Sequence, residues 1–442
     1  MFFDLDNEPN YWIGTHPELY PNDCSNGSVP WDDVVSRNVK AATAIKKVWG
    51  SAKVFGPVVS GDGMAYGGDY NSPYFVAGTE EFSDYYLSKM AAASVAAGEP
   101  LIDSFDVHYY TVGKSDAECL ESPRLFWDPD ATDISAAETN SLDFDYGDHS
   151  YWDMYWYPRQ TIPRLQRKMA AAYGGQSTAP PGLSFSEYNP GCETAISGGV
   201  AEADLLGIFG REGVYAATAW PLKGVTTNGA LANYLVAAFD LYRNYDGAGS
   251  TVGDTAVLAQ TTDVENTSVY AFTQSNAPGH VDVVAINKSS GPLAATVQIE
   301  CAPALTTVAA YALAGSKTGV AAVSPAPAVS CSGGTCTVSL TLPALSATTS
   351  DSKNTSVYAF THSTEAGAAE IVAINKLATA ESVTIQLGSS PAFHTAVLYH
   401  LVNGKAAVVA VPGAAPAVSC SCDACSLTFT MPATSATTVV LR

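Results

Sequence analysis

The sequence carries little charge, and most of what it carries is acidic. Charged residues make up 14% of the 442, and 21 lysine and arginine residues stand against 43 aspartate and glutamate residues, for a formal net charge of −22. The basic residues form no cluster that would offset this balance locally. Because an acidic surface repels phosphate groups and anionic lipids, we expect neither nucleic acid nor a membrane as a partner. A neutral ligand is compatible with this charge.

Long apolar runs are also missing. No uninterrupted run of about 18 apolar residues occurs, so we expect no membrane-spanning helix. The residues after Met1 lack the basic and then apolar pattern of a secretory signal peptide. In contrast, 47% of the residues are hydrophobic, which is typical of a folded protein with large cores. At this length we expect two or three domains.

Several of the nine cysteines cluster near the C-terminus, in sequence that otherwise indicates β-strands. Cys331 and Cys336 form one group, and Cys420, Cys422 and Cys425 form another. The second group has no further cysteine pair or nearby histidine, so a zinc site is weakly supported. We therefore favour close-range disulfides.

The first 245 residues or so alternate apolar runs with stretches of helical periodicity, which predicts βα units around a parallel sheet. The predicted strands are Phe2–Asp6, Lys53–Ser60, Ile102–Tyr110, Leu183–Tyr188 and Val214–Trp220. The first predicted helix ends at Gly50, with Ser28 as a cap and Pro30 in its first turn. The other helices are predicted at Thr79–Gly98, Pro158–Tyr173, Val200–Arg211 and Ala230–Tyr245. Right-handed crossovers would join all five strands in one sheet.

The rest of the chain has a β pattern with an internal repeat. NTSVYAF occurs at residues 266–272 and again at 354–360, and VAINK follows at 284–288 and 372–376. PAVSC also recurs, at residues 327–331 and 416–420. This spacing predicts two tandem β-sandwiches of about 90 residues. We therefore expect three domains, at residues 1–250, 251–350 and 351–442.

Two glutamates stand at the carboxyl ends of predicted strands. Glu8 follows the first strand in Asp-Asn-Glu-Pro, and Glu187 ends the fourth in Ser-Glu-Tyr-Asn. A lone glutamate is usually one of many solvated acids. In βα barrels, however, the carboxyl ends of the strands share one mouth, so both side chains should meet there. Glycoside hydrolysis needs such a pair, with carboxyl groups about 5 to 5.5 Å apart in retaining enzymes.

The residues around both glutamates resemble glycoside hydrolase family 44. DLDNEPNYWIGTHPELYP, from Asp4 to Pro21, is similar to the acid/base segment of that family, and LSFSEYNPG, from Leu183 to Gly191, to its nucleophile segment. LLGIFGREGVYAATAWPL, from Leu205 to Leu222, resembles its last helix-strand unit, and DGAGSTVGDTAVLAQTTDVENTSVYA, from Asp246 to Ala271, its entry into the β-sandwich. The resemblance spans about residues 1–350.

The resemblance implies retaining endo-hydrolysis of cellulose-type β-1,4-glucan or xyloglucan, by double displacement. Glu8 would be the general acid/base and Glu187 the nucleophile, so Glu8 must hold its proton while Glu187 stays ionised. Asn7 would bond the sugar 2-hydroxyl. A competing hypothesis is an inactive remnant that only binds carbohydrate.

Further substrate contacts can be predicted on the strands. His108 and Tyr110 lie on one face of the third strand and form a polar row with Asp106, although a structural role for His108 is equally supported. Tyr188 adjoins the nucleophile, but its side chain should alternate away from Glu187.

Tryptophans could stack on glucose rings. Trp220 ends the last strand and is the strongest candidate, and Trp152 with Trp156 could form a second platform. A core role is favoured for each tryptophan except Trp220, and Trp12 and Trp127 belong to that group.

The chemistry requires no cofactor. The loop from Gly61 to Asp69 is rich in glycine and acidic residues and could hold a structural calcium ion, but an ordinary loop is favoured.

The resemblance places Glu8 on the fourth strand of a (β/α)8 TIM barrel and Glu187 on the seventh. The sequence therefore predicts a partial barrel, strands 4 to 8 only, followed by two tandem β-sandwich repeats. We expect an N-terminally truncated chain whose full-length parent is secreted, with no signal peptide here. Unpaired sheet edges of an open barrel predict self-association.

Overall fold

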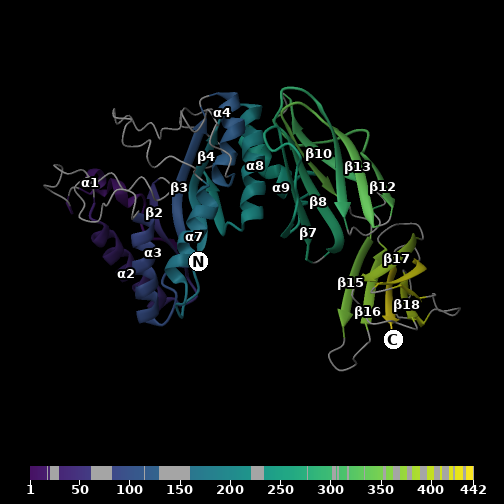
Figure 1. The fold of residues 1–442 in the computed structure, drawn as a ribbon, viewed down its shortest axis with the longest axis horizontal. Helices are drawn as coiled ribbons and strands as arrows, with labels where there is room; N and C mark the ends of the chain where they lie inside the picture. The colour runs from purple at the N-terminus through teal and green to yellow at the C-terminus, as the bar shows by residue number, and fades with distance from the viewer. Residues whose placement is uncertain are drawn as a thin grey trace. The chain divides into compact units, whose positions relative to one another are not determined.

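The structure is a computed structural model of the 442-residue chain. It describes residues 1–16, 18–19, 29–60, 82–113, 115–128, 160–220, 233–275, 277–300, 305, 308–315, 318–332 and 334–351, and beyond these the course of the strands between residues 355 and 441. The chain falls into two compact units, Met1–Phe239 and Asp240–Arg442 (Figure 1). The domain boundaries predicted at residues 250 and 350 stay predictions.

The first unit is built on a parallel sheet of five strands in the order β1-β2-β3-β4-β5. The strands are β1 (Phe2–Asp4), β2 (Lys53–Ser60), β3 (Ser104–Gly113), β4 (Gly182–Gly191) and β5 (Ala216–Ala219). All five coincide with predicted strands, and their sequential order confirms the predicted βα progression. The sheet is thus part of a barrel wall.

Helices alternate with these strands. The longer ones are α2 (Trp31–Val48), α3 (Phe82–Ala97), α7 (Thr161–Tyr173), α8 (Ile196–Glu212) and α9 (Asn233–Arg243), and the shorter ones are η1 (Pro9–Tyr11), α1 (Trp12–Thr15), α4 (Asp116–Glu121) and η3 (Ser122–Phe126). Helix α2 begins at Trp31 with Pro30 as its cap, and Ser28, the predicted cap, lies outside the described residues. Among the described residues, no helix is long and apolar enough to cross a membrane.

Aromatic residues on one face of the sheet pack against the helices. Phe105, Tyr109 and Phe185 are at most 1% exposed. Their rings contact Tyr86 of α3, Phe126 of η3 and Phe209 of α8. Since neighbouring residues of a strand point to opposite faces, the other face is left to the residues between them.

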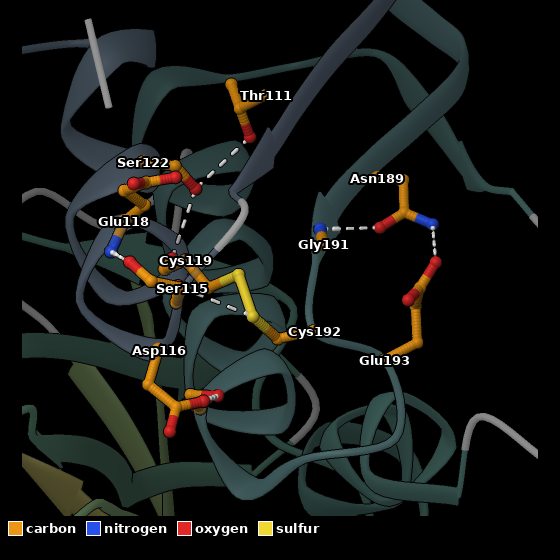
Figure 2. Close-up of a disulfide and its surroundings, with 11 residues drawn as sticks. Thr111, Ser115, Asp116, Glu118, Cys119, Ser122, Asn189, Gly191, Cys192 and Glu193 are labelled. Atoms are coloured by element: carbon orange, nitrogen blue, oxygen red, sulfur yellow. Dashed lines mark hydrogen bonds between the residues drawn. A yellow bond between two sulfur atoms is a disulfide. The ribbon is translucent and has the colours of Figure 1, made fainter. Parts of the chain in front are cut away.

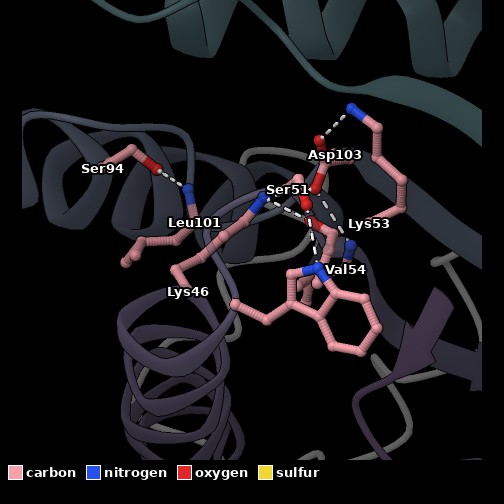
Figure 3. Close-up of polar contacts among 9 residues, drawn as sticks. Lys46, Ser51, Lys53, Val54, Ser94, Leu101 and Asp103 are labelled. Carbon is pink, nitrogen blue, oxygen red and sulfur yellow. Dashed lines mark hydrogen bonds and ion pairs between the residues drawn. The ribbon is translucent and has the colours of Figure 1, made fainter. Parts of the chain in front are cut away.

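Asp103 fastens the amino ends of β2 and β3 (Figure 3). Its carboxylate accepts hydrogen bonds from Lys46 Nζ at 2.7 Å, Lys53 Nζ at 2.9 Å and the Val54 amide at 2.9 Å. Burial alone would raise the pKa of Asp103, but these three donors hold it below the usual value. The cluster therefore stabilises the end of the sheet that lies away from both predicted catalytic glutamates.

The second unit consists of antiparallel sheets. Its first part pairs in the orders β11-β10-β14-β8-β7-β6 and β12-β13-β9, and its second part in the orders β15-β16-β22-β18-β19 and β17-β21-β20. The strands of the first part are β6 (Thr255–Val257), β7 (Thr267–Gln274), β8 (Ala277–Asn287), β9 (Leu293–Glu300), β10 (Ala309–Ala314), β11 (Ala321–Ala322), β12 (Ala328–Ser332), β13 (Thr335–Leu342) and β14 (Ser346–Asp351). Those of the second are β15 (Thr355–Thr361), β16 (Ala369–Asn375), β17 (Glu381–Gly388), β18 (Ala396–Val402), β19 (Val409–Ala410), β20 (Val418–Ser421), β21 (Ala424–Met431) and β22 (Ser435–Leu441).

Two disulfides occur among the described residues. Cys331 and Cys336 pair across β12 and β13, which confirms the close-range disulfide predicted for this group. Cys119 pairs with Cys192 across 73 positions and joins α4 to the segment that follows β4 (Figure 2). This second pair was not predicted. The side chains of Cys420, Cys422 and Cys425 lie outside the described residues.

Candidate active site

Glu8 lies in the turn that follows β1, and β2 holds this turn. The Glu8 amide donates to the carbonyl of Val58 at 2.8 Å, and the Ser60 amide donates to Asn10 Oδ1 at 3.0 Å. Glu8 and Val58 have positive φ angles of 43° and 60°, which residues with side chains rarely adopt. Such conformations persist where surrounding contacts enforce them, often at functional sites.

Glu187 comes from β4 and stands opposite His108 of β3 in the sheet register. The side chains of Glu8 and Glu187 are 23% and 24% exposed, so both can be reached from solvent. The convergence predicted from the strand ends is therefore present in the structure.

His108 and Tyr110 connect the two glutamates. His108 Nδ1 lies 2.9 Å from Glu8 Oε1 and 3.3 Å from Glu187 Oε2, and the ring is 1% exposed. The Tyr110 hydroxyl donates to Glu187 Oε2 at 2.6 Å. Burial, and then the hydrogen bond to Glu187, raise the pKa of Tyr110, so its hydroxyl keeps its proton. The predicted polar row thus faces both carboxylates.

The spacing of this cluster fits two chemistries. One ligand atom from each of Glu8, His108 and Glu187 lies within 4.8 Å of the others, so the cluster could bind a divalent cation. The hydrogen bond between His108 and Glu8, and the contact of the same ring nitrogen with Glu187, already account for this proximity. The same spacing brings the two carboxylates close to the separation found in retaining glycosidases, about 5 to 5.5 Å.

Comparison with known sequences points to one family. The sequence profile of glycoside hydrolase family 44 matches residues 1–112. Endoglucanase A of Paenibacillus lautus is 32% identical over 316 residues, which cover 67% of this chain and 41% of that protein. The beta-mannanase/endoglucanase A of Caldicellulosiruptor saccharolyticus is 32% identical over 307 residues, which cover 64% of this chain and 21% of that protein.

Solved structures agree with the sequences. A family 44 xyloglucanase from Paenibacillus polymyxa, solved with xyloglucan, has a TM-score of 0.63 at 32% identity and covers 79% of this chain and 65% of its own. The family 44 endoglucanase of Clostridium thermocellum has a TM-score of 0.65 at 30% identity, with coverage of 79% and 66%. The chain belongs to glycoside hydrolase family 44. It spans less than half the length of the two curated relatives, 41% and 21%.

Of the other predicted ligand contacts of this family 44 chain, the structure describes Asn7 and Trp220. Asn7 is exposed beside Glu8, and Trp220 is 39% exposed at the end of β5. The Trp220 backbone is held on both sides, because its amide donates to the Tyr188 carbonyl at 2.8 Å and its carbonyl accepts from Asn189 Nδ2. Trp152, Trp156 and the loop Gly61–Asp69 lie outside the described residues.

The prediction that Tyr188 contacts substrate is wrong. Its side chain is 0% exposed and points to the helix side of the sheet, where its hydroxyl donates to Glu202 Oε1 of α8 at 2.5 Å. Strand alternation explains this placement, since Glu187 points the other way. Trp12, 4% exposed, belongs to the core as favoured, and Trp127 is half-buried beneath the Arg211 guanidinium.

Sequence reasoning missed three residues that shape this site. Asn189 is 4% exposed, accepts from the Gly191 amide at 2.6 Å and donates to Glu193 Oε1 at 2.8 Å (Figure 2). Ser186 bonds to Asp106, and Glu202 lies buried beneath β4. A signal for Asn189 was its position two residues after Glu187, on the same side of the strand alternation.

Proposed function

We propose that this family 44 chain hydrolyses internal β-1,4-glucosidic bonds of cellulose-type glucan or xyloglucan with retention of configuration. The observation that carries the proposal is the pair Glu8 and Glu187, whose carboxylate oxygens lie within 4.8 Å of each other. The relatives named endoglucanase and xyloglucanase support the same substrate class.

In the first step, Glu187 attacks the anomeric carbon while Glu8 gives its proton to the leaving glycosidic oxygen. This forms a covalent glycosyl-enzyme and releases one part of the glucan chain. Tyr110 donates to Glu187 Oε2, and His108 lies against both carboxylates. These contacts fix the direction in which the nucleophile points, and fixed orientation is a large source of rate acceleration.

In the second step, Glu8 acts as a base. It removes a proton from water, the water oxygen attacks the anomeric carbon, and the bond to Glu187 breaks. Two inversions at the same carbon leave the product in the β configuration. Asn7 would bond the 2-hydroxyl, and the exposed ring of Trp220 would stack on a glucose unit.

The test is the release of reducing ends from carboxymethylcellulose and xyloglucan by this chain, beside the variants Glu8→Gln and Glu187→Gln. We expect the unmodified chain to be active, and each folded variant to lose activity by at least about 10³-fold. In the comparisons with variants below, the unmodified chain is called the parent. Proton NMR should then show the β-anomer of the product first. Appearance of the α-anomer first would refute double displacement, and a folded but inactive parent that still binds glucan would establish the carbohydrate-binding alternative.

We further propose that residues 251–350 and 351–442 are two tandem β-sandwich repeats. Matching strands have the same order in both parts, with β7-β8 corresponding to β15-β16 and β12-β13-β9 to β20-β21-β17. The register also matches, since Tyr270 pairs with Val284 and Tyr358 with Val372. Limited proteolysis between residues 351 and 355 should release a folded fragment that begins at residue 1 and ends between residues 351 and 354.

We also propose that the protein is extracellular and that it self-associates. The disulfide Cys119–Cys192 favours an oxidising compartment. Among the described strands, β1 pairs only with β2 and β5 only with β4, and Phe2 beside one edge is 66% exposed. Non-reducing peptide mapping of the protein from its native culture tests the first, and light scattering across a concentration series tests the second.

A further inference from the structure

The strand that carries Glu187 contains an irregularity immediately before it. Asp106 pairs with Ser184, whereas His108 pairs with Glu187, so β4 advances three residues where β3 advances two. In a regular parallel pair, Ser186 would stand opposite His108. The extra residue is a β-bulge, and it decides which residue of β4 faces the site.

Side-chain directions confirm the shift. Phe185 and Tyr188 both point to the helix side and are 0% exposed, so two consecutive residues between them, Ser186 and Glu187, lie on the other face. Regular alternation would place only one residue of such a pair there. Without the bulge, the side chain of Glu187 would point away from Glu8, because a slip of one residue reverses the face.

Asp106 satisfies the backbone group that the bulge frees. Its Oδ1 accepts from the Ser186 amide at 3.0 Å, and its Oδ2 accepts from the Ser186 hydroxyl. The carboxylate is 0% exposed. Burial raises the pKa of Asp106 to about 7, although the hydroxyls of Ser186 and Ser184 oppose the shift. A buried acid of this kind is costly unless its hydrogen bonds are made, and here both oxygens make one with the same bulge residue.

We propose that Asp106 is a positioning residue for the nucleophile: its carboxylate holds the bulge at Ser186 that turns Glu187 toward Glu8 and Tyr110. The inference rests on the proposed function. Asp106 does not touch the reacting atoms and acts through Glu187 alone.

The first measurement compares kcat and KM of the parent with those of Asp106→Ala, Asp106→Asn and Ser186→Ala on 2,4-dinitrophenyl β-cellobioside. Asp106→Ala should lower kcat about 10- to 100-fold, the scale for a misplaced reacting group, with KM changed less than about twofold. Asp106→Asn keeps an oxygen for the Ser186 amide and should recover kcat to within about threefold of the parent, and Ser186→Ala should lose about 3- to 10-fold.

The second measurement separates positioning from general damage. In a Glu187→Gly background, azide replaces the missing carboxylate: its nitrogen bonds to the anomeric carbon as the bond to dinitrophenolate breaks. If Asp106 acts only through Glu187, adding Asp106→Ala or Ser186→Ala to Glu187→Gly should leave the azide-rescued rate unchanged within about twofold. The double-mutant comparison needs only one of these variants to fold.

Asp103→Asn is the matched control, since Asp103 is another bonded aspartate, at the opposite end of β3. It should lower stability while leaving kcat as in the parent. Two results would overturn the role of Asp106 but leave the proposed function standing. One is that Asp106→Ala also lowers the azide-rescued rate in the Glu187→Gly background, and the other is that Asp106→Ala changes KM rather than kcat. A folded parent without activity, together with no azide rescue of Glu187→Gly, would overturn the proposed function and this inference with it.

Discussion

Glu202 makes the stability of the first unit depend on pH. Its side chain is 0% exposed beneath β4, and burial raises its pKa from 4.5 to about 8, although the hydrogen bond from Tyr188 opposes the shift. Oε2 of Glu202 has no hydrogen-bond partner among the described residues. At neutral pH, the folded protein therefore holds a proton on Glu202 that the unfolded chain has released.

This difference in bound protons makes the folded state less stable as the pH rises. Because the folded pKa is the higher one, Glu202 contributes stability below about pH 4.5, and that contribution is lost as the pH rises toward about 8. Between these values the folded state binds one proton more, so the free energy of unfolding falls by about 1.4 kcal/mol per pH unit. From pH 5.5 to 7.0 the loss amounts to about 2 kcal/mol.

Glu202→Gln removes this dependence, because the amide resembles the neutral acid in shape and its oxygen can still accept from Tyr188. We expect the stability of the variant, relative to the parent, to increase by about 2 kcal/mol between pH 5.5 and 7.0. Any dependence contributed by Asp106 is present in both proteins and cancels in the comparison.

Urea unfolding at three pH values, followed by tryptophan fluorescence, measures this difference. All seven tryptophans lie within residues 1–239, so the signal reports the first unit alone. Glu99→Gln is the control, since Glu99 is exposed in the folded state and its removal should leave the slope as in the parent. If the free energy of unfolding changed with pH in the same way for the parent and for Glu202→Gln, the claim that Glu202 is buried in its neutral form would be refuted.

Three further predictions concern other parts of the first unit. Asp103→Ala leaves the ammonium of Lys46, 6% exposed, without its carboxylate and should cost about 2 to 4 kcal/mol of unfolding free energy in urea titrations. Cys119→Ser removes the disulfide to Cys192 and should lower the free energy of unfolding by about 2 to 4 kcal/mol. Reduction of the unmodified protein should lower it by the same amount, whereas reduction of the variant should cause no further loss. Trp220→Ala should raise KM for glucan oligosaccharides about 5- to 50-fold with a smaller change in kcat, as loss of ring stacking would; an unchanged KM would exclude the stacking platform.

The parts of the site that could be predicted follow from regular geometry. Glu8 and Glu187 could be placed at the same edge of the sheet, because the carboxyl ends of parallel strands lie together there and this placement needs only the strand order. The face that Glu187 takes depends in addition on the bulge before it. His108 and Tyr110 face them because residues two apart in a strand share a face. The same alternation predicted that Tyr188 points away from Glu187, and its burial against Glu202 bears this out.

The parts that could not be predicted depart from regular geometry. Val58 holds the Glu8 turn with φ at 60°, a conformation that the propensity of a β-branched residue argues against. Cys119 of α4 and Cys192, which follows β4, are 73 positions apart and meet only through the fold. The buried acid Glu202 gives no signal in a sequence where acidic residues are common.

Two irregularities of the backbone lie close to the pair of glutamates. The positive φ at Val58 and the bulge at Ser186 lie in β2 and β4, on either side of the regular stretch of β3 that carries His108. Each one bears on one of the two glutamates: the Val58 carbonyl accepts a hydrogen bond from the Glu8 amide, and the bulge reverses the face of Glu187. A flat parallel ladder spaces its side chains by the strand separation and the pleat, and it does not bring two carboxylates from non-adjacent strands within 3.3 Å of one histidine ring nitrogen, as they are here. The irregular backbone of the two flanking strands is therefore what converts a regular sheet edge into a site with the carboxylate spacing that glycoside hydrolysis requires.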